Sequence, residues 1–287
     1  MLREEKMKPY NTLVYRVTSY SIIGREKGEI GRLNEDCKIV DKHRLIFAVA
    51  DGISQGGLGD LASSLACAYF EVEAIKIRKG LRNGIIKPGE VLDLMKQVLK
   101  EASKVVMGIP HEQSRDSPGC TFDGCLIYND TAYICHCGDS RVYYFDRQGL
   151  RLLTEDHKLM PESLPQNERE MWSIMYSGIY SYLGLTPEEM TIDIFKQPLE
   201  PGSVLFVATD GVTNLITRDE LEKILSLEDT KEMKSSILAL VKKPQGMARW
   251  YASVKGITFE QAQRRLRKKD DATFIIIKVM ENAPNHH

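Results

Sequence analysis

The feature that most restricts the fold of this chain is a pair of apolar segments joined by a very short link. Residues 121–128 and 131–137 are both rich in apolar side chains, and only Asn129 and Asp130 separate them. Two residues of this kind are typical of a β-hairpin turn, whereas a parallel connection between strands needs a dozen residues or more. The centre of the chain is therefore predicted to be antiparallel sheet.

The other predicted elements follow from the same reading of apolar periodicity. Further strands are expected at 12–18, 37–41, 45–50, 141–145, 150–153, 203–209 and 273–279. One helix is expected at 59–79, an apolar stretch rich in helix-forming residues, and another at 90–107, where apolar residues recur three or four positions apart. The segment 155–182 has little regular pattern and is expected at the surface. Helices segregated from antiparallel strands indicate the α+β class, and with no linker or repeat we expect a single domain over residues 1–287.

Two helix starts are marked by capping boxes, in which a threonine is followed three residues later by a glutamate or glutamine. These pairs are Thr217 with Glu220 and Thr258 with Gln261. Because such pairs satisfy the free N–H groups of a first helical turn, helices are predicted to begin at both places.

Composition argues against several classes of protein. The chain is 43% hydrophobic and 28% charged, with a net charge of −1, so no charge excess points to nucleic acid or a membrane as the main partner. No apolar run approaches the ~20 residues that a bilayer requires, and the first ten residues lack the apolar stretch of a secretory signal. We expect an intracellular, cytoplasmic protein that is a monomer.

The six cysteines do not predict a disulfide framework in a chain of 287 residues. Cys135, His136 and Cys137 raise the possibility of a zinc site. However, they lie inside an alternating strand pattern, and no second ligand pair stands at the spacing of a zinc knuckle. Buried free cysteines are the preferred interpretation.

Acidic residues stand at the ends of several apolar strands, usually beside glycine. The pairs are Asp51-Gly52, Gly138-Asp139, Asp210-Gly211 and Asp270-Asp271, with Glu35-Asp36 just before another strand. Taken singly, an Asp-Gly pair after a strand is more often a hairpin turn. Here neither Asp51-Gly52 nor Asp210-Gly211 leads into a second strand, because each is followed by a loop and a helix-forming stretch. Strand ends from one sheet region can therefore gather these carboxylates together.

A dense carboxylate cluster repels itself unless cations neutralise it. Oxygen ligands select hard ions such as Mg²⁺ or Mn²⁺, and a glycine after the aspartate lets a backbone carbonyl approach as a further ligand. Two such ions ~3.5–4 Å apart suit the hydrolysis of phosphate esters, because they generate hydroxide and bind phosphoryl oxygens. No GxxxxGK[ST] phosphate loop is present.

Seven short segments carry a resemblance to a known family. They are 34–36 (NED), 49–63 (VADGISQGGLGDLAS), 119–121 (GCT), 138–141 (GDSR), 154–157 (TEDH), 209–214 (TDGVTN) and 270–273 (DDAT). In this order they resemble the metal-dependent serine/threonine protein phosphatases of type 2C, over about residues 12–280. The resemblance implies a sandwich of two antiparallel sheets flanked by helix pairs. It also implies phosphorylated proteins as substrates and two Mn²⁺ or Mg²⁺ ions as cofactors.

The resemblance also assigns the two core ions to particular residues. Asp51 would bridge both ions, and Gly52 would offer its backbone carbonyl. Asp210 would bind the first ion, and Asp270 is the ligand of the last motif. Asp51 and Asp210 are thus the residues most directly expected in catalysis.

Further metal contacts are implied at two other places. Glu35 and Asp36 match the motif that serves the second ion or its waters. Asp139 would hold a weaker third ion together with Asp210. The alternative for Asp139 is a turn residue that pairs with Arg141.

The chain departs from the family pattern at several positions. A phosphate-binding arginine is usual where this chain has Gly31, and Arg32 stands one place later. A local shift would bring Arg32 into the site as the phosphate-binding residue; the alternative is that the metals alone hold the phosphate. Ile53 replaces a histidine proposed as general acid in some members. His157 is expected to hydrogen-bond to the strand edge where the flap begins. Residues 158–182 occupy the flap region but match it poorly.

Two readings compete with a phosphatase. One is a catalytically weak homologue that acts as a phosphoprotein-binding regulator, although Asp51, Asp210 and Asp270 are all retained. The other is a calcium-binding module, which would require a contiguous loop such as DxDxDG that the sequence lacks.

Overall fold

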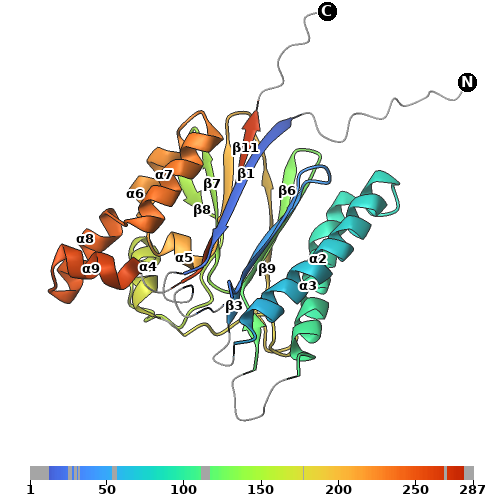
Figure 1. Ribbon diagram of the computed structural model, residues 1–287. Coiled ribbons are helices and arrows are strands. Elements are labelled where there is room, and N and C mark those ends of the chain that lie inside the picture. The colour runs from blue at the N-terminus through green and yellow to red at the C-terminus, as the bar shows by residue number, and fades with distance from the viewer. Residues whose placement is uncertain are drawn as a thin grey trace, which may run out of the picture.

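In the computed structural model, the chain folds into four layers, with two β-sheets face to face and helices over the outer face of each (Figure 1). The structure describes residues 13–24, 28, 31, 33–53, 57–110, 117–176, 178–267 and 270–280. The α+β sandwich expected from the sequence is confirmed. In that part of the chain, no helix has the length and apolar character needed to cross a lipid bilayer.

The first sheet has the strand order β1-β11-β10-β7-β8, with every neighbouring pair antiparallel. Its strands are β1 (Val14–Ile22), β7 (Arg141–Asp146), β8 (Gly149–Leu152), β10 (Val204–Ala208) and β11 (Ala272–Met280). The first and last of these in the chain lie side by side, with Ile22 opposite Ala272. This pairing brings Asp270, which precedes β11, to the same sheet end as Asp210, which follows β10.

The second sheet has the strand order β2-β3-β5-β6-β9, and the short β4 pairs with the end of β3. Its strands are β2 (Asp36–Asp41), β3 (Ile46–Ile53), β4 (Gly119–Cys120), β5 (Phe122–Tyr128), β6 (Thr131–Cys137) and β9 (Asp193–Pro198). The register of β2 and β3 places Asp36 directly opposite Asp51.

The central hairpin forms as the short link predicts. Asn129 and Asp130 both adopt left-handed backbone angles, with φ of 49° and 54°, which a two-residue type I′ turn requires. Successive residues of β5 then face opposite sides: Leu126 packs toward the helices and Ile127 toward the other sheet. Both faces are apolar because the strand is covered on both sides.

Helices cover the two sheets from outside, and three apolar clusters separate the four layers. Helices α2 (Gly59–Arg82) and α3 (Val91–Met107) pack on the second sheet. The first sheet is covered from the other side, where the chain forms α5 (Asp210–Thr213), α6 (Arg218–Leu225), α7 (Thr230–Lys242), α8 (Gly246–Lys255) and α9 (Phe259–Arg267). Both predicted capping boxes form: the Thr217 N–H donates to Glu220 over 3.0 Å, and the Thr258 N–H donates to Gln261 over 3.0 Å.

Most described residues of 155–182 are exposed or half-buried, as expected of a surface segment, but the expectation is wrong at four polar positions. His157, Lys158, Ser173 and Ser181 are buried there, and the segment contains α4 (Gln166–Trp172) and the 3₁₀ turn η2 (Ser173–Met175). Polar residues normally indicate exposure, but these are buried with polar partners elsewhere in the chain. The edge strand β9 was also not predicted, because its sequence DIFKQP is largely polar and only partly buried.

Candidate active site

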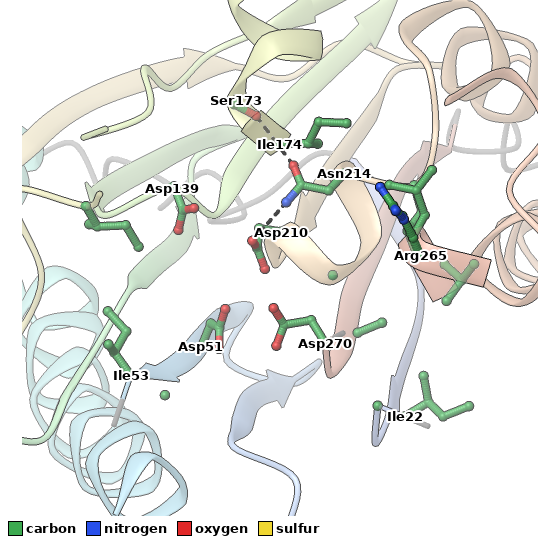
Figure 2. A pocket seen from close by; sticks show the side chains of 18 of the residues that line it. Ile22, Asp51, Ile53, Asp139, Ser173, Ile174, Asp210, Asn214, Arg265 and Asp270 are labelled. Atoms are coloured by element: carbon green, nitrogen blue, oxygen red, sulfur yellow. Dashed lines mark hydrogen bonds between the residues drawn. The ribbon is translucent and has the colours of Figure 1, made fainter. Parts of the chain in front are cut away.

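Four of the aspartates expected to bind metal line one cavity of about 810 Å³. Figure 2 shows Asp51, Asp139, Asp210 and Asp270 pointing toward a common space. Asp51 lies near the end of β3, Asp139 follows β6, Asp210 follows β10 and Asp270 precedes β11. The two sheets therefore bring strand ends from distant parts of the sequence to one site, as the acidic pattern predicts.

Glu35 and Asp36 lie beside this cavity and are each only 9% exposed. Asp36 faces Asp51 across the β2–β3 pair, and its Oδ2 accepts a hydrogen bond of 2.9 Å from the Thr209 hydroxyl. Thr209 immediately precedes Asp210, so this bond ties the acidic motif of one sheet to that of the other.

Two glycines allow the motifs to approach each other more closely than any side chain would permit. A Cβ on Gly52 would lie 2.1 Å from the carbonyl oxygen of Gly59 at the start of α2. A Cβ on Gly211 would lie 1.8 Å from the carbonyl oxygen of Asp271. The glycine after each aspartate is therefore a steric requirement for assembling the site.

Asp271 is a positioning residue that the sequence analysis did not assign. Its side chain is fully buried, and its two oxygens accept backbone N–H bonds from Gly24 at 2.6 Å and from Glu35 at 2.7 Å. It thereby holds the end of β1 and the Glu35-Asp36 segment against the start of β11. Its position in the last motif, next to Asp270, is the sequence feature that could have identified it.

Asp139 is paired with a lysine that the sequence analysis did not single out. The Nζ of Lys158 lies 2.6 Å from Asp139 Oδ2. Arg141 instead binds Asp156 through two parallel bonds of 2.8 and 2.7 Å. The alternative interpretation of Asp139 as the partner of Arg141 is therefore wrong.

Four aspartates of the site, Asp36, Asp51, Asp139 and Asp210, have raised pKa values. Burial is the main cause for each, and neighbouring carboxylates add to it, giving a pKa of about 8 for Asp36 and about 6 for Asp139 and Asp210. The pKa of Asp51 is raised by burial and by four neighbouring aspartates. Without a cation, such a cluster retains protons to limit its own repulsion.

The residues present fit a hard divalent cation. Among the described side chains, Asp36 Oδ1, Asp139 Oδ1 and Asp210 Oδ1 are buried and have no hydrogen-bond partner. Asn214 holds only the other oxygen of Asp210, at 2.9 Å. Carboxylate oxygens left unsatisfied at one cavity are the donor set that Mg²⁺ and Mn²⁺ prefer.

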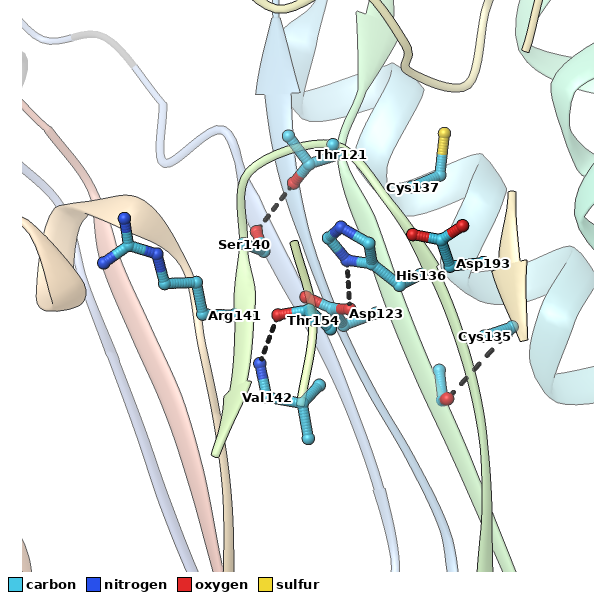
Figure 3. Close-up of polar contacts among 12 residues, drawn as sticks. Thr121, Asp123, Cys135, His136, Cys137, Ser140, Arg141, Val142, Thr154 and Asp193 are labelled. Carbon is cyan, nitrogen blue, oxygen red and sulfur yellow. Dashed lines mark hydrogen bonds and ion pairs between the residues drawn. The ribbon is translucent and has the colours of Figure 1, made fainter. Parts of the chain in front are cut away.

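Behind the site, His136 and His157 converge with Asp193, and each of their ring nitrogens has a hydrogen-bond partner. His136 Nδ1 lies 2.7 Å from Asp123, as Figure 3 shows, and its Nε2 lies 2.9 Å from the Glu155 carbonyl. His157 Nδ1 accepts from the Gly138 N–H, and its Nε2 lies 3.2 Å from Asp193. The bond to Gly138, at the end of β6, confirms that His157 bonds to the strand edge.

The nearby cysteines lie on the other face of β6. Cys135 and Cys137 pack into the cluster between the second sheet and its helices, whereas Ile134, which precedes Cys135, faces the other sheet. Because successive strand residues point to opposite faces, His136, between the two cysteines, is on the same face as Ile134. The cysteines therefore do not converge with His136 on a shared metal position, and the residues that do converge with it are His157 and Asp193.

The remaining expected site residues have different outcomes. Gly52 and Ile53 line the cavity. Arg32 lies outside the described residues. Ser173 and Asn214 also line the cavity and were not assigned roles: Ser173 is brought there by the tertiary fold, whereas Asn214 lies one helical turn after Asp210 in the 209–214 motif.

Comparison with known proteins agrees with this architecture. A family model described as protein phosphatase 2C matches residues 23–242. The chain belongs to the protein phosphatase 2C family. The resemblance inferred from the sequence motifs is thereby confirmed.

Relatives in this family come from several bacteria. The serine/threonine phosphatase stp of Listeria monocytogenes is 27% identical over 252 residues, covering 85% of this chain and 95% of that protein. The protein phosphatase PhpP of Streptococcus pneumoniae is 24% identical over 186 residues, covering 64% of this chain and 73% of that protein.

Solved structures share the fold. The serine/threonine phosphatase PstP/Ppp of Mycobacterium tuberculosis superposes with a TM-score of 0.72 at 16% identity, covering 94% of this chain and all of that one. The catalytic domain of PstP in complex with two manganese ions gives a TM-score of 0.69 at 17% identity, with the same coverage. At these identities the likeness shows a common fold.

Proposed function

We propose that this chain hydrolyses phosphoserine and phosphothreonine monoesters of proteins with a metal-activated water. The observation that carries the proposal is the cluster of buried carboxylates with unsatisfied oxygens at one cavity. Family membership supports the reaction class, and the named activity of the Listeria relative supports serine and threonine as the phosphorylated residues.

In this proposal Asp51, Asp210 and Asp270 are the ligands of two Mn²⁺ or Mg²⁺ ions, with the Gly52 carbonyl as a further ligand. Glu35 and Asp36 serve the second ion or its waters. Bound divalent ions would lower the pKa of a water and offset the charge of phosphoryl oxygens. Thr209, Asn214 and Asp271 hold the carboxylates in place through hydrogen bonds to the carboxylates or to their backbone.

The same cavity has an apolar side suited to the substrate chain. Its lining includes Ile174 and Tyr176 from the flap segment and Tyr251 and Leu266 from α8 and α9. A phosphorylated side chain could reach the aspartates while its peptide neighbours pack on this wall. We propose that the wall, rather than the carboxylates, selects among phosphoproteins.

The experiment that tests the proposal is an assay with a phosphothreonine peptide in the presence of Mn²⁺, with and without a chelator. We expect phosphate release with Mn²⁺ and its loss with the chelator. Binding of the phosphopeptide without release would instead favour the catalytically weak, phosphoprotein-binding homologue. Equal release under both conditions would contradict metal dependence.

The cytoplasmic location, the monomeric state and the absence of nucleic-acid or membrane partners stay predictions from the sequence. Phosphorylated proteins are the proposed partners. The single-domain extent over 1–287, with a core of about 12–280, likewise stays a proposal.

A further inference from the structure

Lys158 is a buried cation in the lining of the cavity that holds the four aspartates. In the described lining, the other basic residues, Lys242 and Arg265, are exposed, whereas the Lys158 side chain is only 4% exposed. Its Nζ lies 2.6 Å from Asp139 Oδ2 and donates over 3.4 Å to the Ser173 carbonyl. Because a lysine is almost never buried without a partner for its charge, the Lys158–Asp139 ion pair is a built part of the site.

The backbone fixes Lys158 in this place. Gly138 and His157 exchange two hydrogen bonds: the His157 N–H donates to the Gly138 carbonyl at 2.8 Å, and the Gly138 N–H donates to His157 Nδ1 at 3.1 Å. Asp139 follows Gly138 and Lys158 follows His157, so this pairing sets the two charged side chains opposite each other. Lys158 also forms a β-bridge with Ile179, which restrains the segment from the other side.

We propose that the Lys158 ammonium is a fixed third cation of the acidic cluster, so that the site takes two divalent ions and Asp139 binds none. This replaces the third ion that the family resemblance implies between Asp139 and Asp210. The inference rests on the proposed function to the extent that two ions bind at Asp51, Asp210 and Asp270.

The charges at Asp139 support this assignment. One oxygen of Asp139 is already taken by Lys158, and Lys158 is close enough to attract the Asp210 carboxylate as well. A divalent ion between Asp139 and Asp210 would therefore lie beside an ammonium held in place by the backbone. In a buried site the repulsion between them is only weakly screened. The ammonium already offsets the negative charge that a third ion would neutralise.

The test is to count the Mn²⁺ ions that the full chain binds, by equilibrium dialysis or by the electron paramagnetic resonance signal of free Mn²⁺. We expect two ions for the wild-type chain and three for Lys158→Met, the third binding at least tenfold more tightly than any third ion of the wild type. Lys242→Met, which removes an exposed cation of the same cavity, is the matched control and should keep two. Three ions in the wild type, or two in a folded Lys158→Met, would overturn the inference.

A second variant keeps the test decisive if Lys158→Met does not fold. Asp139→Asn should still bind two ions, because Asp139 holds the lysine and no ion. Loss of an ion in Asp139→Asn would refute the inference while leaving the proposed function intact. Fewer than two ions in the wild type would instead refute the proposed function itself, and the inference with it.

Discussion

At the scale of single residues, the neighbours of each aspartate set its role. Asp51 lies among four other aspartates, Asp210 has one oxygen held by Asn214 and one free, and Asp139 is neutralised by Lys158. Residues of one type at one cavity are thus expected to respond differently to substitution.

Asp51→Asn and Asp210→Asn should each lower turnover of a phosphothreonine peptide by more than about 100-fold. Loss of residues that only support metal ligands already costs about 10- to 100-fold, and these variants remove charged ligands themselves. Steady-state kinetics at saturating Mn²⁺ is the measurement, with circular dichroism to show that the fold is kept. Asp93→Asn, on the exposed side of α3, is the control. A wild-type rate for either cavity variant would contradict the metal assignment.

Arg32→Ala should raise the KM for phosphopeptide by about tenfold or more and change kcat less. A guanidinium offers a planar fork of donors to phosphate, and hydrogen bonds to charged groups contribute about 1.5–3 kcal/mol. Arg32→Lys keeps the charge but loses the planar fork of donors, so its KM should lie between those of the wild type and Arg32→Ala. Arg32 lies outside the described residues, so this prediction comes from the sequence alone. An unchanged KM for Arg32→Ala would mean that the phosphate is held without it.

Asp123→Asn should lower the free energy of unfolding by about 3–5 kcal/mol, as expected when one partner of a buried ion pair is removed. Burial alone would lower the pKa of His136, but the charge and hydrogen bond of Asp123 outweigh it and raise the pKa overall. The stability that His136 contributes is therefore complete below its unfolded pKa and lost as the pH rises through the higher folded pKa. Urea denaturation at pH 6 and pH 9 is the measurement. The variant should lose more stability at pH 6, and an equal loss at both values would argue against a charged His136.

At the scale of elements, local signals predicted what local geometry controls. The two-residue link before Thr131 fixed an antiparallel hairpin, and the threonine caps marked the starts of helices, because each pattern acts within a few residues. The convergence of the strand-end aspartates was predicted on a different ground, because strand ends from one sheet region can meet however far apart they lie in the sequence. The partners of Asp139 and Asp271 could not be predicted, because each depends on contacts that only the assembled fold creates, with the flap for Asp139 and with β1 and the Glu35 segment for Asp271.

The flap is joined to α8 by the chain's two tryptophans, Trp172 and Trp250, whose rings meet edge to face at 5.4 Å and 89°. Such a contact contributes about 0.5–1.5 kcal/mol beyond burial. Trp250→Ala should therefore loosen the flap residues that line the cavity and raise the KM for phosphopeptide by roughly 2- to 10-fold. An aryl phosphate, which has no peptide chain to pack there, should be affected less.

Trp250→Phe is the matched control, because it keeps an aromatic ring at α8 and should stay near the wild-type KM. The fluorescence of the remaining Trp172 reports directly on the contact and should shift to longer wavelength in Trp250→Ala. An equal rise in KM for both substrates would indicate damage to the aspartate cluster rather than to the flap.

At the scale of the whole molecule, the acidic cluster lies where the two sheets meet. Asp36 and Asp51 belong to the second sheet, whereas Asp210 and Asp270 extend from strands of the first. Repulsion among these carboxylates therefore acts between the two halves of the sandwich. A cation held between them would oppose that repulsion, so metal binding and global stability should be linked.

The metal-free protein should accordingly lose stability as the pH rises from about 4 to about 8. The native state keeps protons on Asp139 and Asp210 up to a pKa of about 6 and on Asp36 up to about 8, whereas the unfolded chain releases them near pH 4. Between its unfolded and folded pKa values, each of these carboxyl groups lowers the free energy of unfolding by about 1.4 kcal/mol per pH unit. Saturating Mn²⁺ should displace these protons, flatten the dependence and add about 2.7 kcal/mol at 100 times its dissociation constant. Urea denaturation at pH 5 and pH 8, with chelator or with Mn²⁺, measures both effects, and identical slopes with and without Mn²⁺ would show that the ions do not bind at these carboxylates.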